Sequence, residues 1–219
     1  MIFQYDFPEE GFLAYSTAVR QIRTERRGGE EVVSEARTRS RFSQRAVDLG
    51  EVVLTLELSV ESATMEIPSL GLPPFELEGF PRVGRVRMER NGTVLEMPGD
   101  MPVGRGLVFP ARDLEPGDSW QVTEKLENGR AVVEHTFAGW EEDLALFSSR
   151  SLDYRAEADG ALLEGALEAE TLFDPEAGRA VRALSSFTTR VRSGEEEILT
   201  QVASHVELEP LEGLGEAHA

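Results

Sequence analysis

Alternation of apolar and polar side chains along residues 162–208 is the feature that most limits how this chain can fold. Valine, phenylalanine, alanine, serine and threonine recur at every second position of 181–191, and a similar pattern runs along 198–208. The turns at 174–178 and 193–196 both contain glycine. Period-two alternation interrupted by such turns is typical of antiparallel strands that bury one face. The sequence therefore predicts an all-β fold.

Earlier segments show the same pattern or an ambiguous one. Residues 32–42 and 51–61 alternate clearly, whereas 12–22 and 161–172 fit the face of a helix as well as a strand. We interpret 12–22 as a strand because threonine, valine, tyrosine and phenylalanine favour strands, and 161–172 as a strand because its apolar residues alternate. We expect an antiparallel, strongly curved sheet or a partly open barrel or sandwich.

The length of 219 residues suits one domain that spans 1–219. A stretch rich in proline and glycine separates two segments, 1–98 and 110–208, in which strands and turns follow in a similar order. The two segments are either similar halves of a duplicated fold or separate runs of strands that share ordinary strand chemistry. Residues 209–219 are expected to form a tail.

Residues 67–84 combine prolines and glycines with large apolar side chains. Proline and glycine disfavour a regular ladder, and a long apolar loop commonly lies against the body of a protein. We therefore expect a flap that covers a site for an apolar or amphipathic ligand. The predicted ligand-binding residues are Leu70, Leu72, Phe75, Phe80, Trp120 and Trp140. The alternative is that the aromatic residues among them seal the end of a β core.

Charge is distributed unevenly along the chain, whose net charge is −19. The first 45 residues contain eight arginines and seven acids, so the remainder is strongly acidic. Because an acidic body repels phosphate backbones, we do not expect nucleic acid as a partner. Arg37, Arg39 and Arg41 share one face of the alternating segment 32–42 and form the predicted interaction face. They pair either with acids elsewhere in the chain or with another subunit of a homo-oligomer.

The sequence contains no set of residues that indicates a catalytic or metal site. Cysteine is absent, which excludes disulfides, thiolate nucleophiles and zinc–thiolate sites. Ser119 lacks the glycine-flanked turn of a hydrolase nucleophile, and the acids Asp113, Glu115 and Asp118 lack the spacing of a calcium loop. For His135 we expect a hydrogen-bonded structural role. We therefore expect no catalytic residues, no metal and no cofactor, and hence a protein that is not an enzyme.

No run of about 18 apolar residues is present, so no membrane-spanning helix is expected. The first residues lack the basic region followed by an apolar one that marks a signal peptide. The expected location is the cytoplasm, although an exported protein from which a leader had been removed would look the same.

Two short motifs resemble a group of uncharacterised bacterial all-β proteins. One is Phe-Pro at 109–110 followed by Pro-Gly-Asp-Ser-Trp at 116–120, and the other is Phe-Asp-Pro-Glu-Ala-Gly at 173–178. Many members of that group are exported or lipid-anchored, so the resemblance implies an all-β fold and export but no activity. This chain lacks the cysteine to which a lipid would be attached.

The function expected from these observations is that of a non-enzymatic binding or interaction module. Small side chains along one face of 32–42 would leave room for an apolar small molecule or a lipid between the sheet and the 67–84 flap. The alternative is a structural or assembly subunit that uses the arginine face. A hydrolase that uses acids or Ser119 ranks third.

Overall fold

The computed structural model describes residues 1–9, 11–97, 106–126, 128–158 and 161–209. Within them the strands form a single antiparallel sheet, so the predicted all-β class is confirmed. One short 3-10 helix, η1 (Pro68–Leu70), is present in this part of the chain, and no helix there has the length and hydropathy of a membrane span. The strands are β1 (Leu13–Arg27), β2 (Glu30–Leu49), β3 (Val53–Glu66), β4 (Phe75–Glu76), β5 (Arg82–Glu89), β6 (Val94–Glu96), β7 (Ser119–Leu126), β8 (Gly129–Glu141), β9 (Leu144–Ala158), β10 (Ala161–Asp174), β11 (Arg179–Ser193) and β12 (Glu196–Leu208).

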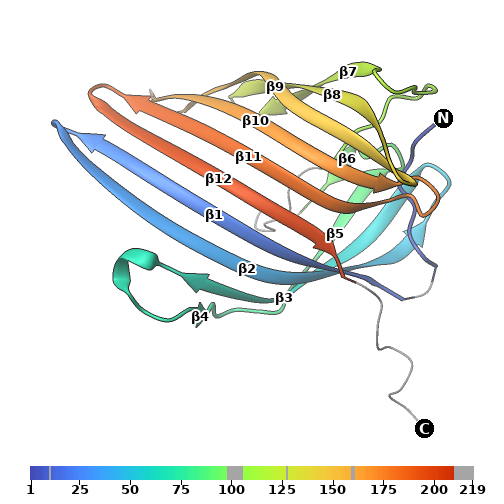
Figure 1. Ribbon diagram of the computed structural model, residues 1–219, viewed down its shortest axis with the longest axis horizontal. Coiled ribbons are helices and arrows are strands. Elements are labelled where there is room, and N and C mark those ends of the chain that lie inside the picture. The colour runs from blue at the N-terminus through green and yellow to red at the C-terminus, as the bar shows by residue number, and fades with distance from the viewer. Residues whose placement is uncertain (10, 98–105, 127, 159–160, 210–219) are drawn as a thin grey trace, which may run out of the picture.

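The sheet is strongly curved but is not closed into a barrel (Figure 1). Its strand order is β6-β5-β3-β2-β1-β12-β11-β10-β9-β8-β7, with β4 paired to β3. Register shifts interrupt the pairing of β2 with β3, of β9 with β10 and of β8 with β9. Such bulges bend a strand and increase its local twist, which allows long strands to follow a curved surface. The curved-sheet alternative among the predicted architectures is therefore the one observed.

The two segments predicted as similar halves occupy opposite sides of this sheet. Residues 1–98 contain β1 to β6, and residues 110–208 contain β7 to β12. The two sides join where β1 pairs with β12, with Tyr15 opposite Leu208. Strands from the beginning and the end of the chain therefore lie side by side at the centre of the sheet. Duplication of one half from the other remains a prediction.

Large apolar side chains gather at one end of the curved sheet, on what we call the core face. Phe137, Phe147 and Phe173, on three neighbouring strands, are completely buried there. Along β2, Phe42 is buried, whereas Val32, on the same face near the start of the strand, is 63% exposed. The row of small side chains that was predicted to face inward is thus buried only at its Phe42 end.

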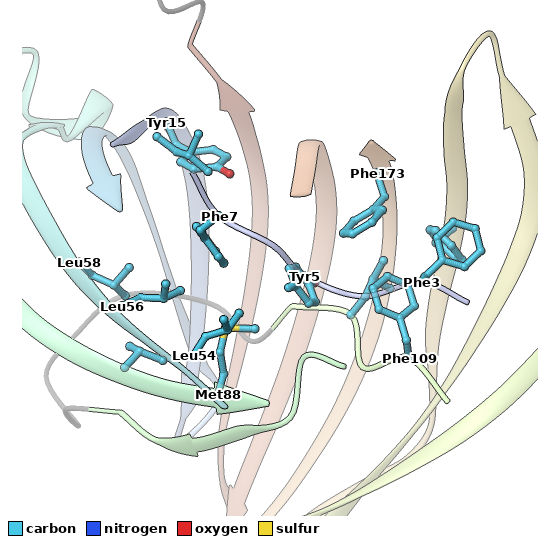
Figure 2. Close-up of a cluster of buried hydrophobic side chains, with 14 of the residues drawn as sticks. Phe3, Tyr5, Phe7, Tyr15, Leu54, Leu56, Leu58, Met88, Phe109 and Phe173 are labelled. Atoms are coloured by element: carbon cyan, nitrogen blue, oxygen red, sulfur yellow. The ribbon is translucent and has the colours of Figure 1, made fainter. Parts of the chain in front are cut away.

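Residues 1–9 fill the curved end of the sheet as an extended segment, here called the N-terminal strap. Phe3, Tyr5 and Phe7 are buried among the side chains of the core face (Figure 2). The amide of Tyr5 donates a hydrogen bond to the carbonyl of Arg90 at 2.6 Å, and the amide of Asp6 donates to the carbonyl of Gly178 at 2.7 Å. Because these two acceptors belong to opposite sides of the sheet, the strap ties the two sides together.

Residues 67–84 extend one edge of the sheet and do not lie over it. The two-residue strand β4 pairs with β3, and the loop that carries η1 projects away from the core (Figure 1). Leu70 and Leu72 are each 58% exposed, and Phe75 is 41% exposed. Phe80 is partly buried and packs against the core cluster. The predicted flap therefore does not enclose a space beneath its apolar side chains at 70–75.

Candidate functional site

A groove of about 1050 Å³ crosses eight strands of the sheet, from β2 through β1 and β12 to β7. The strand register places most of its lining residues in two neighbouring rows that run across the strands. The first row consists of Arg37, Arg20, Ala203, Ser186, Glu168, Arg150 and Glu134. The second row consists of Arg39, Ala18, His205, Leu184, Glu170, Ser148, Thr136 and Ser119.

The groove lies on the face of the sheet opposite the core face. Thr136, which lines the groove, lies between His135 and Phe137, and both of these are buried on the core face. Ser148 likewise follows the buried Phe147. Because successive side chains of a strand point to opposite faces, the groove and the core use alternate residues of the same strands.

Three arginines line one end of the groove, on β1 and β2. Arg20 lies directly opposite Arg37, and one oxygen of Glu35 accepts hydrogen bonds from the Nε atoms of both, at 2.9 Å and 2.8 Å. These hydrogen bonds, from Arg20 first and then from Arg37, lower the pKa of Glu35 to about 2 and keep it ionised. Glu66 lies 3.8 Å from Arg37, and Arg39 forms no ion pair with any described residue. This end therefore retains an excess of positive charge.

The opposite end of the groove is acidic. Arg150 and Glu134 form an ion pair in which Nη2 lies 2.6 Å from Oε1, and hydrogen bonding from Arg150 lowers the pKa of Glu134. Glu168 lies opposite Arg150 in the register, yet neither Glu168 nor Glu170 forms an ion pair within the described part of the chain. One arginine thus stands among three carboxylates, which leaves an excess of negative charge.

Short side chains form the floor between the two charged ends. Ala18, Ala203 and Ser186 line this central part, and Leu184, which is 40% exposed, is its largest apolar side chain. Three strand spacings separate β1 from β10. At roughly 4.8 Å per spacing, this distance is about 14 Å. The groove therefore has a cationic end, a centre without arginines or acids, and an anionic end.

The residues predicted to bind a ligand lie elsewhere. The indole Nε1 of Trp120 donates a hydrogen bond to the carbonyl of Val108 at 2.6 Å, and its ring packs 5.5 Å from that of His135. Trp140 is 44% exposed, although its ring centroid lies 5.3 Å from that of Phe137. Trp120 and Phe80 pack against the core cluster, as the alternative interpretation expected, whereas Trp140 and Phe75 are 44% and 41% exposed. None of the six residues lines the groove.

The predicted interaction face is divided between two roles. Arg37 and Arg39 line the groove. Arg41 is paired within the chain, with Nη1 3.2 Å from Glu61 and Nε 2.7 Å from Glu209. Of the two predicted alternatives for these arginines, pairing with acids elsewhere in the chain is the one observed for Arg37 and Arg41.

The residues considered for chemistry have ordinary partners. The hydroxyl groups of Ser119 and Thr136 are hydrogen-bonded at 2.8 Å, and Nδ1 of His135 lies 2.7 Å from Oγ of Ser149 in a buried position. Asp118 accepts hydrogen bonds from the amide of Glu115 and from Arg112, which lower its pKa. Among the described residues, no group of three or more histidines and acids is arranged to hold a metal ion.

The free energy of unfolding is expected to fall by about 2 kcal/mol between pH 7 and pH 5 because of His135. Burial lowers the pKa of His135 to about 4, whereas an unfolded histidine titrates near 6.5. As the pH falls through this window, the unfolded chain therefore takes up a proton that the folded chain excludes. Glu35 and Glu134, whose pKa values are lowered, lose their contribution only at lower pH.

Urea denaturation at pH 7, 6 and 5 measures this effect, and the variant His135→Gln should flatten the profile because glutamine does not titrate. An equally steep profile in the variant would mean that another group causes the loss.

Comparisons with known proteins leave the family open. No family model matches the chain, and no curated protein matches it. A solved structure of a DUF1329 family protein from Desulfovibrio piger ATCC 29098 is 14% identical, and the match covers 94% of this chain and 87% of that chain with a TM-score of 0.20. The translocator domain of autotransporter NalP from Neisseria meningitidis is 8% identical, with 92% and 90% covered and a TM-score of 0.23. Similarities this weak carry no argument, and the resemblance to the bacterial all-β group remains a prediction.

Proposed function

We propose that the protein is a non-enzymatic binding module, that the groove is its binding site, and that its ligand is a linear amphipathic molecule with an anionic group. One observation carries this proposal. The arginine end of the groove continues directly into a centre that is lined by short and apolar side chains. The class of ligand is the one predicted from the sequence, but the binding site is the groove on the face opposite the core face and not the space beneath the 67–84 flap.

Arg39 is the residue best placed to bind the anionic group. It lines the groove and forms no ion pair with a described residue, whereas Arg20 and Arg37 already share Glu35. A guanidinium presents a planar set of donors that matches the oxygens of a carboxylate or a phosphate. Arg20 and Arg37 would also attract the anionic group electrostatically while they remain hydrogen-bonded to Glu35.

The central floor suits an apolar chain. Ala18, Ala203 and Leu184 present aliphatic carbon to the groove, and no arginine or acid lines this part. Covering such a surface with an apolar chain contributes roughly 25 cal/mol for each Å² removed from water. A ligand that combines an anionic group with such a chain therefore meets complementary chemistry at both the end and the centre of the groove.

The hydrogen-bonding partners in and near the groove support binding over hydrolysis. A hydrolytic serine needs a base within hydrogen-bond reach. The hydroxyl of Ser119 is bonded to that of Thr136, and the imidazole of His135 is bonded to Ser149 on the core face. Neither arrangement activates a hydroxyl inside the groove.

Replacement of Arg39 by glutamine is expected to weaken binding of dodecanoate about fivefold, because one exposed charge-assisted contact is worth roughly 1 kcal/mol. Isothermal titration calorimetry with dodecanoate measures this change. Replacement of Ala203 by tryptophan should weaken binding at least tenfold, since the new ring fills the centre of the groove.

Arg85→Gln is the matched control for Arg39→Gln. Arg85 is also exposed and forms no ion pair in the described part of the chain, but it lies on β5, outside the groove. Equal losses in the two arginine variants would indicate an effect of net charge alone. Absence of dodecanoate binding by the unmodified protein would refute the proposal.

A further inference from the structure

We infer that the ligand carries a cationic group as well, and that the groove is built for a short extended peptide with free ends, its carboxylate at Arg39 and its amino group at Glu168 and Glu170. This inference rests on the proposed function, because it assigns the second end of the same groove. The added requirement is a cationic group at the other end of the ligand, which an amphipathic molecule with only an anionic group lacks.

The acidic end supplies two carboxylates for one cation. Glu168 and Glu170 are two residues apart on β10, so both side chains point to the face that carries the groove. Neither forms an ion pair with a described residue, and the nearby Arg150 is held by two hydrogen bonds to Glu134. Two unpaired carboxylates on one strand, in the same groove as an unpaired arginine, are complementary to a molecule with opposite charges at its two ends.

The distance between the ends selects the length of the molecule. Arg39 lies on β2, and Glu170 lies on β10, four strand spacings away. Four spacings are about 19 Å, and the three spacings from β1 to β10 are about 14 Å. An extended peptide spans roughly 3.3–3.6 Å per residue, so about five or six residues bridge the roughly 19 Å between Arg39 and Glu170.

The floor of the groove limits the side chains that such a peptide can carry. Ala203 and Ser186 lie opposite each other on β12 and β11, and His205 lies opposite Leu184 in the next row. Small apolar side chains can rest on this floor without displacing the charged side chains at either end. His205 and Ser186 offer polar atoms to the backbone of the peptide, which an alkyl chain would not use.

Penta-alanine tests this inference in three forms: with free ends, with an acetylated amino end, and with an amidated carboxyl end. We expect the free peptide to bind the unmodified protein, and either blocking group to weaken binding about three- to tenfold. Tri-alanine should bind more weakly than penta-alanine because it cannot reach both ends. Isothermal titration calorimetry at low salt provides the dissociation constants.

Paired variants identify which end of the peptide meets which end of the groove. The double variant Glu168→Gln/Glu170→Gln should weaken the free and the amidated peptides about three- to tenfold but leave the acetylated peptide unchanged. Arg39→Gln should weaken the free and the acetylated peptides but leave the amidated peptide unchanged. Glu76→Gln/Glu78→Gln is the control, because these exposed acids have the same spacing and the same charge but lie outside the groove.

The inference is overturned if acetylation leaves the dissociation constant unchanged, or if the Glu168/Glu170 variant weakens the acetylated peptide as much as the free one. It is also overturned if penta-alanine does not bind. If dodecanoate still binds and depends on Arg39 in these cases, the proposed function stands without the peptide. If neither dodecanoate nor penta-alanine binds, both proposals fail together.

Discussion

Replacement of Phe3 by alanine is expected to lower the free energy of unfolding by about 3–5 kcal/mol, the usual cost of truncating a buried phenylalanine. Phe3 is only 3% exposed, and its ring centroid lies 5.1 Å from that of Phe147 and 5.3 Å from that of Phe137. It also stacks on Phe109 at 5.6 Å. Removing its ring opens a cavity where the strap, the 106–118 segment and the sheet meet, and these rigid neighbours can close it only partly.

Ile2→Ala is the matched control, because Ile2 precedes Phe3 in the strap but is 60% exposed. Its change in the free energy of unfolding should stay within about 0.5 kcal/mol. Urea denaturation followed by tryptophan fluorescence measures both variants. If Phe3→Ala were as mild as Ile2→Ala, the strap would not be part of the core.

The variant Gly92→Ala is expected to lose more than about 3 kcal/mol of stability, because two separate costs add. Gly92 has a φ of 99°, a conformation that costs a residue with a side chain roughly 1–2 kcal/mol. A methyl group there would also lie 2.8 Å from the ring of Tyr5 and closer still to the carbonyl oxygen of Leu107. The turn would have to move away from the strap and from the segment that contains Leu107.

Gly28→Ala separates these two costs. Gly28 lies in a turn with a φ of 59°, and a methyl group added there would meet no atom within 4 Å. It should therefore lose only the conformational part, about 1–2 kcal/mol. Thermal or urea denaturation of the two variants under the same conditions gives the comparison. Similar losses in both would mean that the turn at Gly92 is not pressed against the core.

The strands were predicted from the alternation of apolar and polar side chains, and this pattern was sufficient to identify most of them. Of the two segments that also fitted a helix, 161–172 lies within β10, and 12–22 lies within β1 except for its first residue. Alternation succeeds because the direction of a side chain along a strand depends only on its position in that strand. The same reasoning placed Arg37 and Arg39 together on one face, and both line the groove.

The N-terminal strap was missed although a signal was present. Phe3, Tyr5 and Phe7 are spaced two apart, which is the pattern of a buried extended segment. The run is too short to stand out, and it ends at Pro8. The apolar side chains at 70–75 were predicted to be buried beneath a flap, but they are exposed. Their composition is typical of a segment that covers a core, whereas the pairing of β4 with β3 places them at the edge of the sheet.

No pattern in the sequence predicted the acidic end of the groove. Glu168 and Glu170 are two of 41 acids, and nothing in their neighbourhood along the chain distinguishes them. They become significant only because the pairing of β1 with β12 brings β10 and β2 onto one continuous sheet. Which residues share a row across strands depends on the register of every intervening pair.

The sequence by itself determined that the chain forms strands and which of their side chains share a face. Period-two alternation carries this information locally, residue by residue. The tertiary structure alone decided the order of the strands, the place of the strap and the two rows that make the groove. Those features arise from contacts between residues far apart along the chain, such as Ala18 and His205. The alternation excludes a register shifted by one residue, which would turn the apolar side chains to the other face, but it does not choose among registers shifted by two.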